Sequence, residues 1–330
     1  MTFLPRLVLI VAIAVAALGQ SAGAHALQDG GDDKAPLCSY PIGSPGEVLG
    51  DGFFVRHGYA TENTWYNPGY WHAGEDWYAL EGDTAGAGVY AIAAGRVVFA
   101  GSEYPGRVVI VQHASRLFSM YGHLGYDLPV AEGDEVGRGE LLGTVVNRAD
   151  SVPNHLHFEV RRFLLMDEVN GASPRFGFNC GMNCPPGPGY WPINASDHPS
   201  EVGWRNPTHV VAKRMFPDGV PEGVDVVVSS DPSMERAALW SAPEGDEGAE
   251  QIDDLPLHAG ERYPLLDVAA GNEGRIGESA EAYELWYEIA LGDGERAWVQ
   301  AATASTFETG GDGRPSTIRL AFLPVVEAAE

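Results

Sequence analysis

The sequence predicts an all-β protein made of antiparallel sheets in two successive β-rich parts. From Gly52 to about Arg162, short apolar runs alternate with glycine turns, and no long stretch has the period of a helix. A second series of short apolar runs, separated by acidic and glycine turns, covers residues 224–303. We therefore expect a large antiparallel domain over residues 52–220, followed by a small β-barrel.

The expected strands of the large domain are "VYAIAAG", "RVVFAG", "RVVIVQH", "FSMYGHL", "LLGTVV" and "HLHFEV". Residues 166–206 are rich in Pro, Gly and Asn and are expected to form a long ordered loop or insertion. The segment 207–220 is expected to end this domain. The strands of the second part are "VDVVVSS", "AALWSAP", "RYPLLDVA", "AYELWYEIAL" and "RAWVQAA", and residues 304–330 are expected to be a C-terminal tail.

The start of the chain has the pattern of a secretory signal peptide, which we place at residues 1–26. A basic start precedes the apolar run 7–18, and small residues follow it, so cleavage is expected after Ala24 or Ala26. The run is too short to span a membrane comfortably, and no stable membrane insertion is expected after cleavage. Residues 27–51 are expected to be a linker. We expect the protein to be exported to the periplasm, the cell wall or the medium.

Charge and cysteine content restrict the partners and the redox setting. The net charge of −26 argues against nucleic acid and anionic lipid as partners. An exported protein meets an oxidising compartment, and Cys180 and Cys184 are close enough to form a small disulfide loop. Cys38 is then left over, either as a thiol or in a different pairing.

The stretch "SVPNHLHFEV" places two histidines one residue apart at the start of an expected strand. Side chains at positions i and i+2 of a strand point to the same face, so His155 and His157 should lie side by side, with Glu159 next in the row. Two interpretations follow: two polar residues on a solvated face, or two imidazoles directed at one metal or one reaction. Glu159 is expected to form a surface salt bridge, or else to orient a histidine from behind.

Two further stretches carry candidate site residues. In "YWHAGEDWYAL", His72 and Asp76 would lie about 13 Å apart in an extended strand, so a turn at Ala73-Gly74 is needed to bring them to one ion. In "SMYGHLG", His123 is expected at the end of a strand. Each motif alone is equally compatible with an ordinary turn or a satisfied polar residue. The other histidines are expected near the site (His57, His113) or in loops (His198, His209, His258).

Taken in order, "HAGED", "YGHL" and "HLHFE" resemble the lysostaphin/LytM-type zinc endopeptidases, which cut bacterial peptidoglycan. The resemblance spans about residues 52–162, and it implies a β-rich domain with an open groove across an antiparallel sheet. It further implies that Zn²⁺ is held by three residues, His72, Asp76 and His157. It assigns catalysis to the pair His123 and His155, and it makes peptide cross-links of peptidoglycan the substrate.

Alternatives remain at this stage. Residues 224–303 resemble a bacterial SH3-like module, whose implied role is to hold the enzyme near cell-wall polymer; a packing domain without a ligand is the other interpretation. For the whole chain, the alternatives to an exported zinc endopeptidase are a non-catalytic wall-binding or regulatory protein with a peptidase fold, and a secreted protease that acts on protein substrates.

Overall fold

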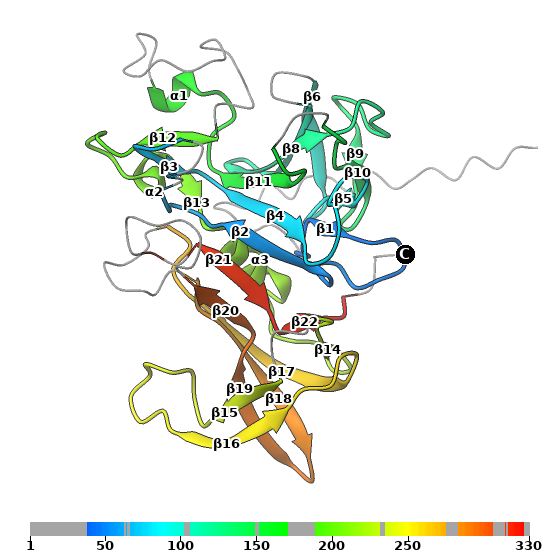
Figure 1. Ribbon diagram of the computed structural model, residues 1–330, viewed down its shortest axis with the longest axis vertical. Coiled ribbons are helices and arrows are strands. Elements are labelled where there is room, and N and C mark those ends of the chain that lie inside the picture. Colours follow the sequence, from blue (N-terminus) through cyan, green and yellow to red (C-terminus); the bar gives the residue numbers. More distant parts are fainter. Residues whose placement is uncertain are drawn as a thin grey trace, which may run out of the picture.

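The computed structural model describes residues 38–62, 64, 67–101, 106–148, 152–170, 189–231, 235–274, 283–305, 314 and 316–326 (Figure 1). The expected signal peptide, residues 27–37 of the expected linker and the pair Cys180 and Cys184 lie outside the described residues. Within them, no helix combines the length and the apolar character needed to cross a membrane.

The prediction of an all-β, antiparallel protein is confirmed: within the described ranges, every pairing between named strands is antiparallel. The largest sheet has the order β20-β21-β2-β4-β11-β8-β7-β6-β9, and β13 pairs with β11. Its strands are β2 (Phe53–His57), β4 (Glu75–Ala79), β6 (Gly95–Gly101), β7 (Arg107–Ala114), β8 (Leu117–Leu124), β9 (Glu135–Val136), β11 (Leu156–Arg161), β13 (Trp204–Arg205), β20 (Ala302–Ser305) and β21 (Thr317–Leu320).

The other strands of the described residues form three smaller sheets. One joins β1 (Ile42–Gly43), β5 (Gly88–Tyr90) and β10 (Leu141–Thr144), and another joins β3 (Tyr70–His72) and β12 (Tyr190–Pro192). The last has the order β16-β15-β19-β18-β17-β14-β22. Its strands are β14 (Asp225–Val228), β15 (Arg236–Trp240), β16 (Gln251–Pro256), β17 (Arg262–Ala270), β18 (Leu285–Gly292), β19 (Glu295–Gln300) and β22 (Phe322–Pro324).

The insertion predicted at residues 166–206 contains α1 (Asp167–Asn170), α2 (Pro199–Val202), β12 and β13 within its described part. Helix α3 (Pro207–Met215) follows directly. Asn206 caps it by accepting a hydrogen bond from the His209 N–H, and Pro207 occupies its first turn, both of which favour a helix start. The loop position predicted for His209 is therefore wrong. Helix α3 packs against both β11 and β17, so it connects the two sheets.

The two β-rich parts are joined by hydrogen bonds as well as by the chain. Strand β21 pairs with β2, with Ile318 opposite Val55, so the large sheet continues into the second part, as Figure 1 shows. One cluster of buried residues includes Trp77 from the first part and Tyr287 from the second. The segment 304–330, for which the sequence predicts a tail, contributes β21 and β22. We call residues 224–326 the C-terminal unit.

Candidate metal centre

A break between two short strands brings His72 next to Asp76. His72 ends β3 and Asp76 lies on β4, with the predicted turn at Ala73-Gly74 between them. A Cβ atom on Gly74 would lie 2.3 Å from the carbonyl oxygen of Phe158, so only glycine lets the turn pass this close to β11. As a result, His72 Nε2 lies 3.2 Å from Asp76 Oδ1.

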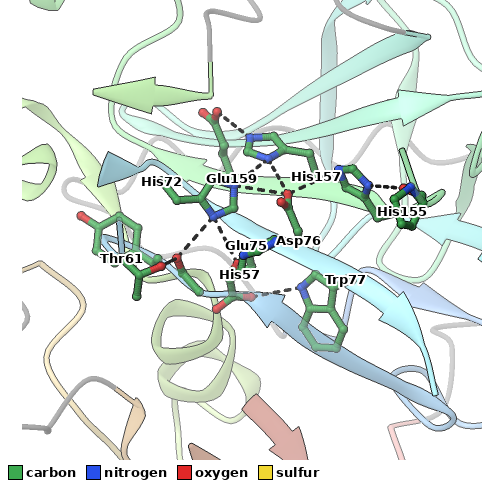
Figure 2. Close-up of polar contacts among 12 residues, drawn as sticks. His57, Thr61, His72, Glu75, Asp76, Trp77, His155, His157 and Glu159 are labelled. Atoms are coloured by element: carbon green, nitrogen blue, oxygen red, sulfur yellow. Dashed lines mark hydrogen bonds and ion pairs between the residues drawn. The ribbon is translucent and has the colours of Figure 1, made fainter. Parts of the chain in front are cut away.

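The third residue comes from the neighbouring strand β11. In the sheet register His157 stands opposite Asp76 on β4, and its Nδ1 lies 2.9 Å from Asp76 Oδ1. The distance from His157 Nδ1 to His72 Nε2 is 3.1 Å, so the three atoms form a compact triangle, and Figure 2 shows the three side chains converging. Tetrahedral coordination with bonds of about 2.0 Å separates ligand atoms by about 3.3 Å. The triangle is therefore close to the size that zinc requires.

Backbone and carboxylate partners fix which nitrogen of each imidazole carries the proton. His72 Nδ1 faces the carbonyl oxygens of His57 and Gly58, at 3.1 and 3.3 Å, and must donate to them. His157 Nε2 lies 3.0 Å from Glu159 Oε1 and donates to that carboxylate. Lone pairs on His72 Nε2 and His157 Nδ1 are thus left to meet Asp76 Oδ1. Three converging lone pairs repel one another unless a cation lies between them, and two imidazoles with one carboxylate suit zinc.

The pKa values agree with a site built for positive charge. Burial opposes ionisation of Asp76, but the imidazoles of His72 and His155 hold the pKa of this carboxyl well below its usual value. Burial also opposes charge on His157, yet hydrogen bonds to Asp76 and Glu159 raise its pKa to about 9. A proton on His157 Nδ1 and a metal ion would satisfy the same atoms, so metal binding should release this proton.

Glu159 lies behind the metal site and is fully buried. Besides holding His157, it accepts hydrogen bonds from Arg161 Nη1 at 3.3 Å and Trp204 Nε1 at 2.9 Å. The prediction of a surface salt bridge for Glu159 is therefore wrong, and the alternative, orientation of a histidine from behind, fits the geometry. The sequence did not point to Arg161 or Trp204 at all, because Trp204 reaches the site from β13, 45 positions along the chain.

His155 lies just before β11 and presents a free lone pair towards the site. Its Nδ1 lies 2.8 Å from the carbonyl oxygen of Pro153, so Nδ1 carries the proton and Nε2 the lone pair. Nε2 lies 3.8 Å from Asp76 Oδ1, and the ring stacks on Tyr78 with centroids 4.9 Å apart. Burial lowers the pKa of His155, and the attraction of Asp76 only partly opposes this, so the imidazole is neutral and can accept a proton at Nε2.

His123 reaches the site through a bulge near the end of β8. Arg107 pairs with Leu124 and Val109 with Tyr121, so β8 has one residue more than β7 across this interval. His123 lies in this extra stretch with a φ of 60°, a conformation that non-glycine residues seldom adopt. Its ring meets that of His155 edge-on, with centroids 4.5 Å apart.

All five predicted site residues are thus brought together from β3, β4, β8 and β11. Their exposed fractions range from 0% for His72 to 7% for His155, so all five are buried; the open groove stays a prediction. Tyr190 of β12, which the sequence did not indicate, stands opposite His72 with ring centroids 5.3 Å apart. His113, expected near the site, is instead bonded to the Ala94 carbonyl and the Ser119 hydroxyl.

Residues 71–171 match the model of peptidase family M23. This part of the chain is a peptidase M23 domain, and it contains all five site residues. No curated protein matches the chain.

The solved structures that are similar to the chain include the following three. A zinc-containing peptidase from Vibrio cholerae is 23% identical over 38% of this chain and 37% of its own, with a TM-score of 0.31. The catalytic domain of a mutant prophage-encoded M23 protein from Enterococcus faecalis is 26% identical over 38% of this chain and 86% of its own, with a TM-score of 0.30. Lysostaphin from Staphylococcus simulans is 14% identical over 89% of this chain and 100% of its own, with a TM-score of 0.32.

Proposed function

We propose that this protein is an exported, zinc-dependent endopeptidase that hydrolyses peptide cross-links of bacterial peptidoglycan. One observation carries the proposal: the lone pairs of His72, Asp76 and His157 converge on one point, while the lone pair of His155 faces the same point from one side. The M23 match over residues 71–171 supports peptide-bond hydrolysis as the reaction class. Hydrolysis of a peptide bond can use a metal ion to activate water and a neighbouring group to accept its proton, and the site offers residues for both.

Three atoms would hold the ion: His72 Nε2, Asp76 Oδ1 and His157 Nδ1. Three protein ligands leave one tetrahedral position open, as in catalytic rather than structural zinc sites. When bound, zinc would polarise the scissile carbonyl and lower the pKa of a water molecule towards neutrality. The partners of the ligands keep them in place, because the carbonyls of His57 and Gly58 hold His72 and the carboxylate of Glu159 holds His157.

The second pair of imidazoles would move and stabilise charge. His155 Nε2 would take a proton from the attacking water and deliver it to the amine that leaves when the C–N bond breaks. Its hydrogen bond to the Pro153 carbonyl keeps Nδ1 protonated throughout and keeps Nε2 directed at the reaction. His123, edge-on to His155, would donate a hydrogen bond to the carbonyl oxygen as negative charge develops, a contribution of about 3–4 kcal/mol at comparable sites.

The substrate class rests on the family resemblance and on the expected export. A signal peptide at residues 1–26 would deliver the enzyme to the compartment that holds the wall. The net charge of −26 disfavours binding of the protein to nucleic acid or anionic lipid, because both are also negatively charged. We also propose that residues 224–303 form an SH3-like module near wall polymer. Six strands of the seven-stranded antiparallel sheet lie in this segment, which is compatible with that assignment, and binding of the protein to purified sacculi is the corresponding test.

The decisive assay is digestion of purified sacculi, followed by mass spectrometry of the released muropeptides. We expect new amino termini within the peptide cross-links, loss of activity with a chelator, and recovery when zinc is added. The His155→Ala protein, purified in the same way, controls for contaminating hydrolases. Parallel digestion of a glycine-rich protein tests the protease alternative: cleavage of that protein with intact sacculi would replace the proposed substrate. Zinc binding without hydrolysis of either substrate would indicate a non-catalytic protein.

A further inference from the structure

The backbone segment that orients His72 is itself held by the C-terminal unit. The carbonyls of His57 and Gly58 accept from His72 Nδ1. A shift of this segment would rotate the imidazole or let its proton move from Nδ1 to Nε2. The hydroxyl of Thr61 donates to the Gly58 carbonyl at 2.8 Å, which fixes the segment from within. The remaining support comes from residues more than 220 positions away in the chain.

Tyr283 and Ile318 of the C-terminal unit supply that support. The Tyr283 hydroxyl accepts a hydrogen bond from the Tyr59 N–H at 2.5 Å. A Cβ atom on Gly58 would lie 2.9 Å from Tyr283 Cε2 and 3.0 Å from Ile318 Cδ1, so the backbone at Gly58 packs directly on these two side chains. Tyr283 is 2% exposed and Ile318 is 0% exposed, and rigid packing of this kind transmits small displacements.

The same tyrosine also lies near the strand that carries Asp76. Burial and the negative charge of Glu75 raise the pKa of the Tyr283 hydroxyl well above its usual value, so this hydroxyl lies near that carboxylate and keeps its proton. Glu75 is fully buried and points away from the metal site, towards Trp77, as Figure 2 shows. It also accepts two hydrogen bonds from Thr208, through the backbone N–H and the hydroxyl of that residue. The Tyr283 hydroxyl therefore accepts from the segment behind His72 and lies near Glu75, the residue that precedes Asp76 on β4.

The attachment of the C-terminal unit around Tyr283 is extensive. His209 of α3 donates to the Asn272 carbonyl at 2.8 Å and accepts from the Glu284 N–H at 3.1 Å. Arg214, near the end of the same helix, forms an ion pair with Glu273. With the pairing of β21 and β2, these contacts hold Tyr283 in a fixed position relative to the large sheet.

We infer that the C-terminal unit is part of the apparatus that shapes the metal site, and that Tyr283 is its positioning residue. This inference rests on the proposed function only in taking His72 and Asp76 as metal ligands. Tyr283 touches no ligand itself. It acts on His72 through the Tyr59 N–H and through its packing against the Gly58 backbone. In this role the unit serves as a structural support for catalysis, whether or not it also binds wall polymer.

The test is the zinc dissociation constant of the Tyr283→Phe protein, measured by competition with a chelator. Phenylalanine keeps the ring against Gly58 but removes the hydroxyl. Partners that touch a ligand directly are typically worth about 10–100-fold in metal affinity, and Tyr283 acts one contact further away, so we expect roughly 3–10-fold weaker binding. We also expect the visible absorption bands of the cobalt-substituted protein to shift, because the ligand geometry relaxes.

Tyr287→Phe is the matched control. Tyr287 is a fully buried tyrosine of the same unit and packs in the core, and among the described residues no hydrogen bond or ring contact joins it to the segment from His57 to Thr61. We expect its zinc affinity and cobalt spectrum to stay as in the wild type. Equal effects of the two variants, or wild-type zinc affinity in Tyr283→Phe, would overturn the inference. If Tyr283→Phe does not fold, the comparison passes to Ile318→Val, with Ile289→Val as its buried control.

The metal measurement separates this inference from the proposed function. A protein whose zinc affinity falls in Tyr283→Phe, but whose wild type leaves sacculi intact, would refute the hydrolase assignment and support the positioning role. A protein that cleaves sacculi, with zinc affinity unchanged in both Tyr283→Phe and Ile318→Val, would refute the positioning role alone. Absence of zinc binding in the wild type would refute both.

Discussion

Replacing Glu159 by Gln should weaken the metal site without removing a ligand. The side chain is fully buried and its carboxylate holds His157 through Nε2 at 3.0 Å. Glutamine has the same shape, and its amide oxygen can still accept from His157 or from Trp204. It no longer offers a negative charge, so His157 becomes a less basic ligand, and Arg161, also fully buried, loses its counter-ion.

Two magnitudes follow. Loss of a carboxylate partner of a metal-binding histidine typically costs about 10–100-fold in metal affinity, or about 1.4–2.7 kcal/mol. Removing one partner of a buried ion pair costs about 3–5 kcal/mol of folding stability, because the remaining charge stays buried and uncompensated. The amide recovers part of this through hydrogen bonding. We therefore expect the zinc-free Glu159→Gln protein to be about 3 kcal/mol less stable and to bind zinc at least tenfold more weakly.

The assay combines urea unfolding of the zinc-free protein with a zinc competition titration of the folded protein. Glu288→Gln is the control, since Glu288 pairs at 3.4 Å with Arg296, whose side chain is 69% exposed, and an ion pair that water screens in this way contributes about 0–1 kcal/mol. Zinc affinity in Glu159→Gln equal to that of the control would refute the role assigned to Glu159. A loss of folding stability without any loss of zinc affinity would show that the Glu159 carboxylate serves only as the counter-ion of Arg161.

Three further predictions concern catalysis, pH and thiol reactivity. His155→Ala and His123→Ala should keep one equivalent of zinc but lose roughly 10²–10⁴-fold in kcat on sacculi, whereas near-normal turnover in His155→Ala would show that another group accepts the proton. Burial lowers the pKa of His113 and His209 to about 4, from 6.5 in the unfolded chain, so the unfolded state binds more protons between these values. Each histidine therefore lowers the free energy of unfolding by roughly 3 kcal/mol as the pH falls from 6.5 to 4, and has no such effect above pH 6.5. In urea unfolding of the zinc-free protein, the midpoint should fall less over this range in His113→Gln than in the wild type. Equal falls would contradict the prediction. Burial raises the pKa of the Cys38 thiol to about 12, so iodoacetamide should label it only after unfolding; rapid labelling of the native protein would show an open site.

Local sequence patterns predicted the elements of the site well. Alternation along a strand placed His155 and His157 on one face, and the limited reach of a metal ion required the turn at Ala73-Gly74. Both features depend on a few neighbouring residues, so the sequence alone could indicate them. The close approach of Gly74 to Phe158 could not be predicted, because it depends on the pairing of β4 with β11.

Features that depend on distant segments were missed or misjudged. Glu159 was expected at the surface because nothing near it in the sequence shows that Trp204 covers it. The bulge that redirects His123 could not be predicted from "SMYGHLG", because it depends on the register between β8 and β7. The attachment of the C-terminal unit through Ile318 joins strands more than 250 positions apart, and no local periodicity records such a pairing.

The zinc content of purified ligand and non-ligand variants tests the central claim most directly. Metal analysis after dialysis should give one zinc per wild-type chain, one per His155→Ala chain, and far less for His72→Ala, Asp76→Ala and His157→Ala. Stoichiometric zinc in Asp76→Ala would remove that carboxylate from the ligand set. Loss of zinc in His155→Ala with retention in His157→Ala would contradict the account, because it would exchange the roles of the two imidazoles in "NHLHFEV".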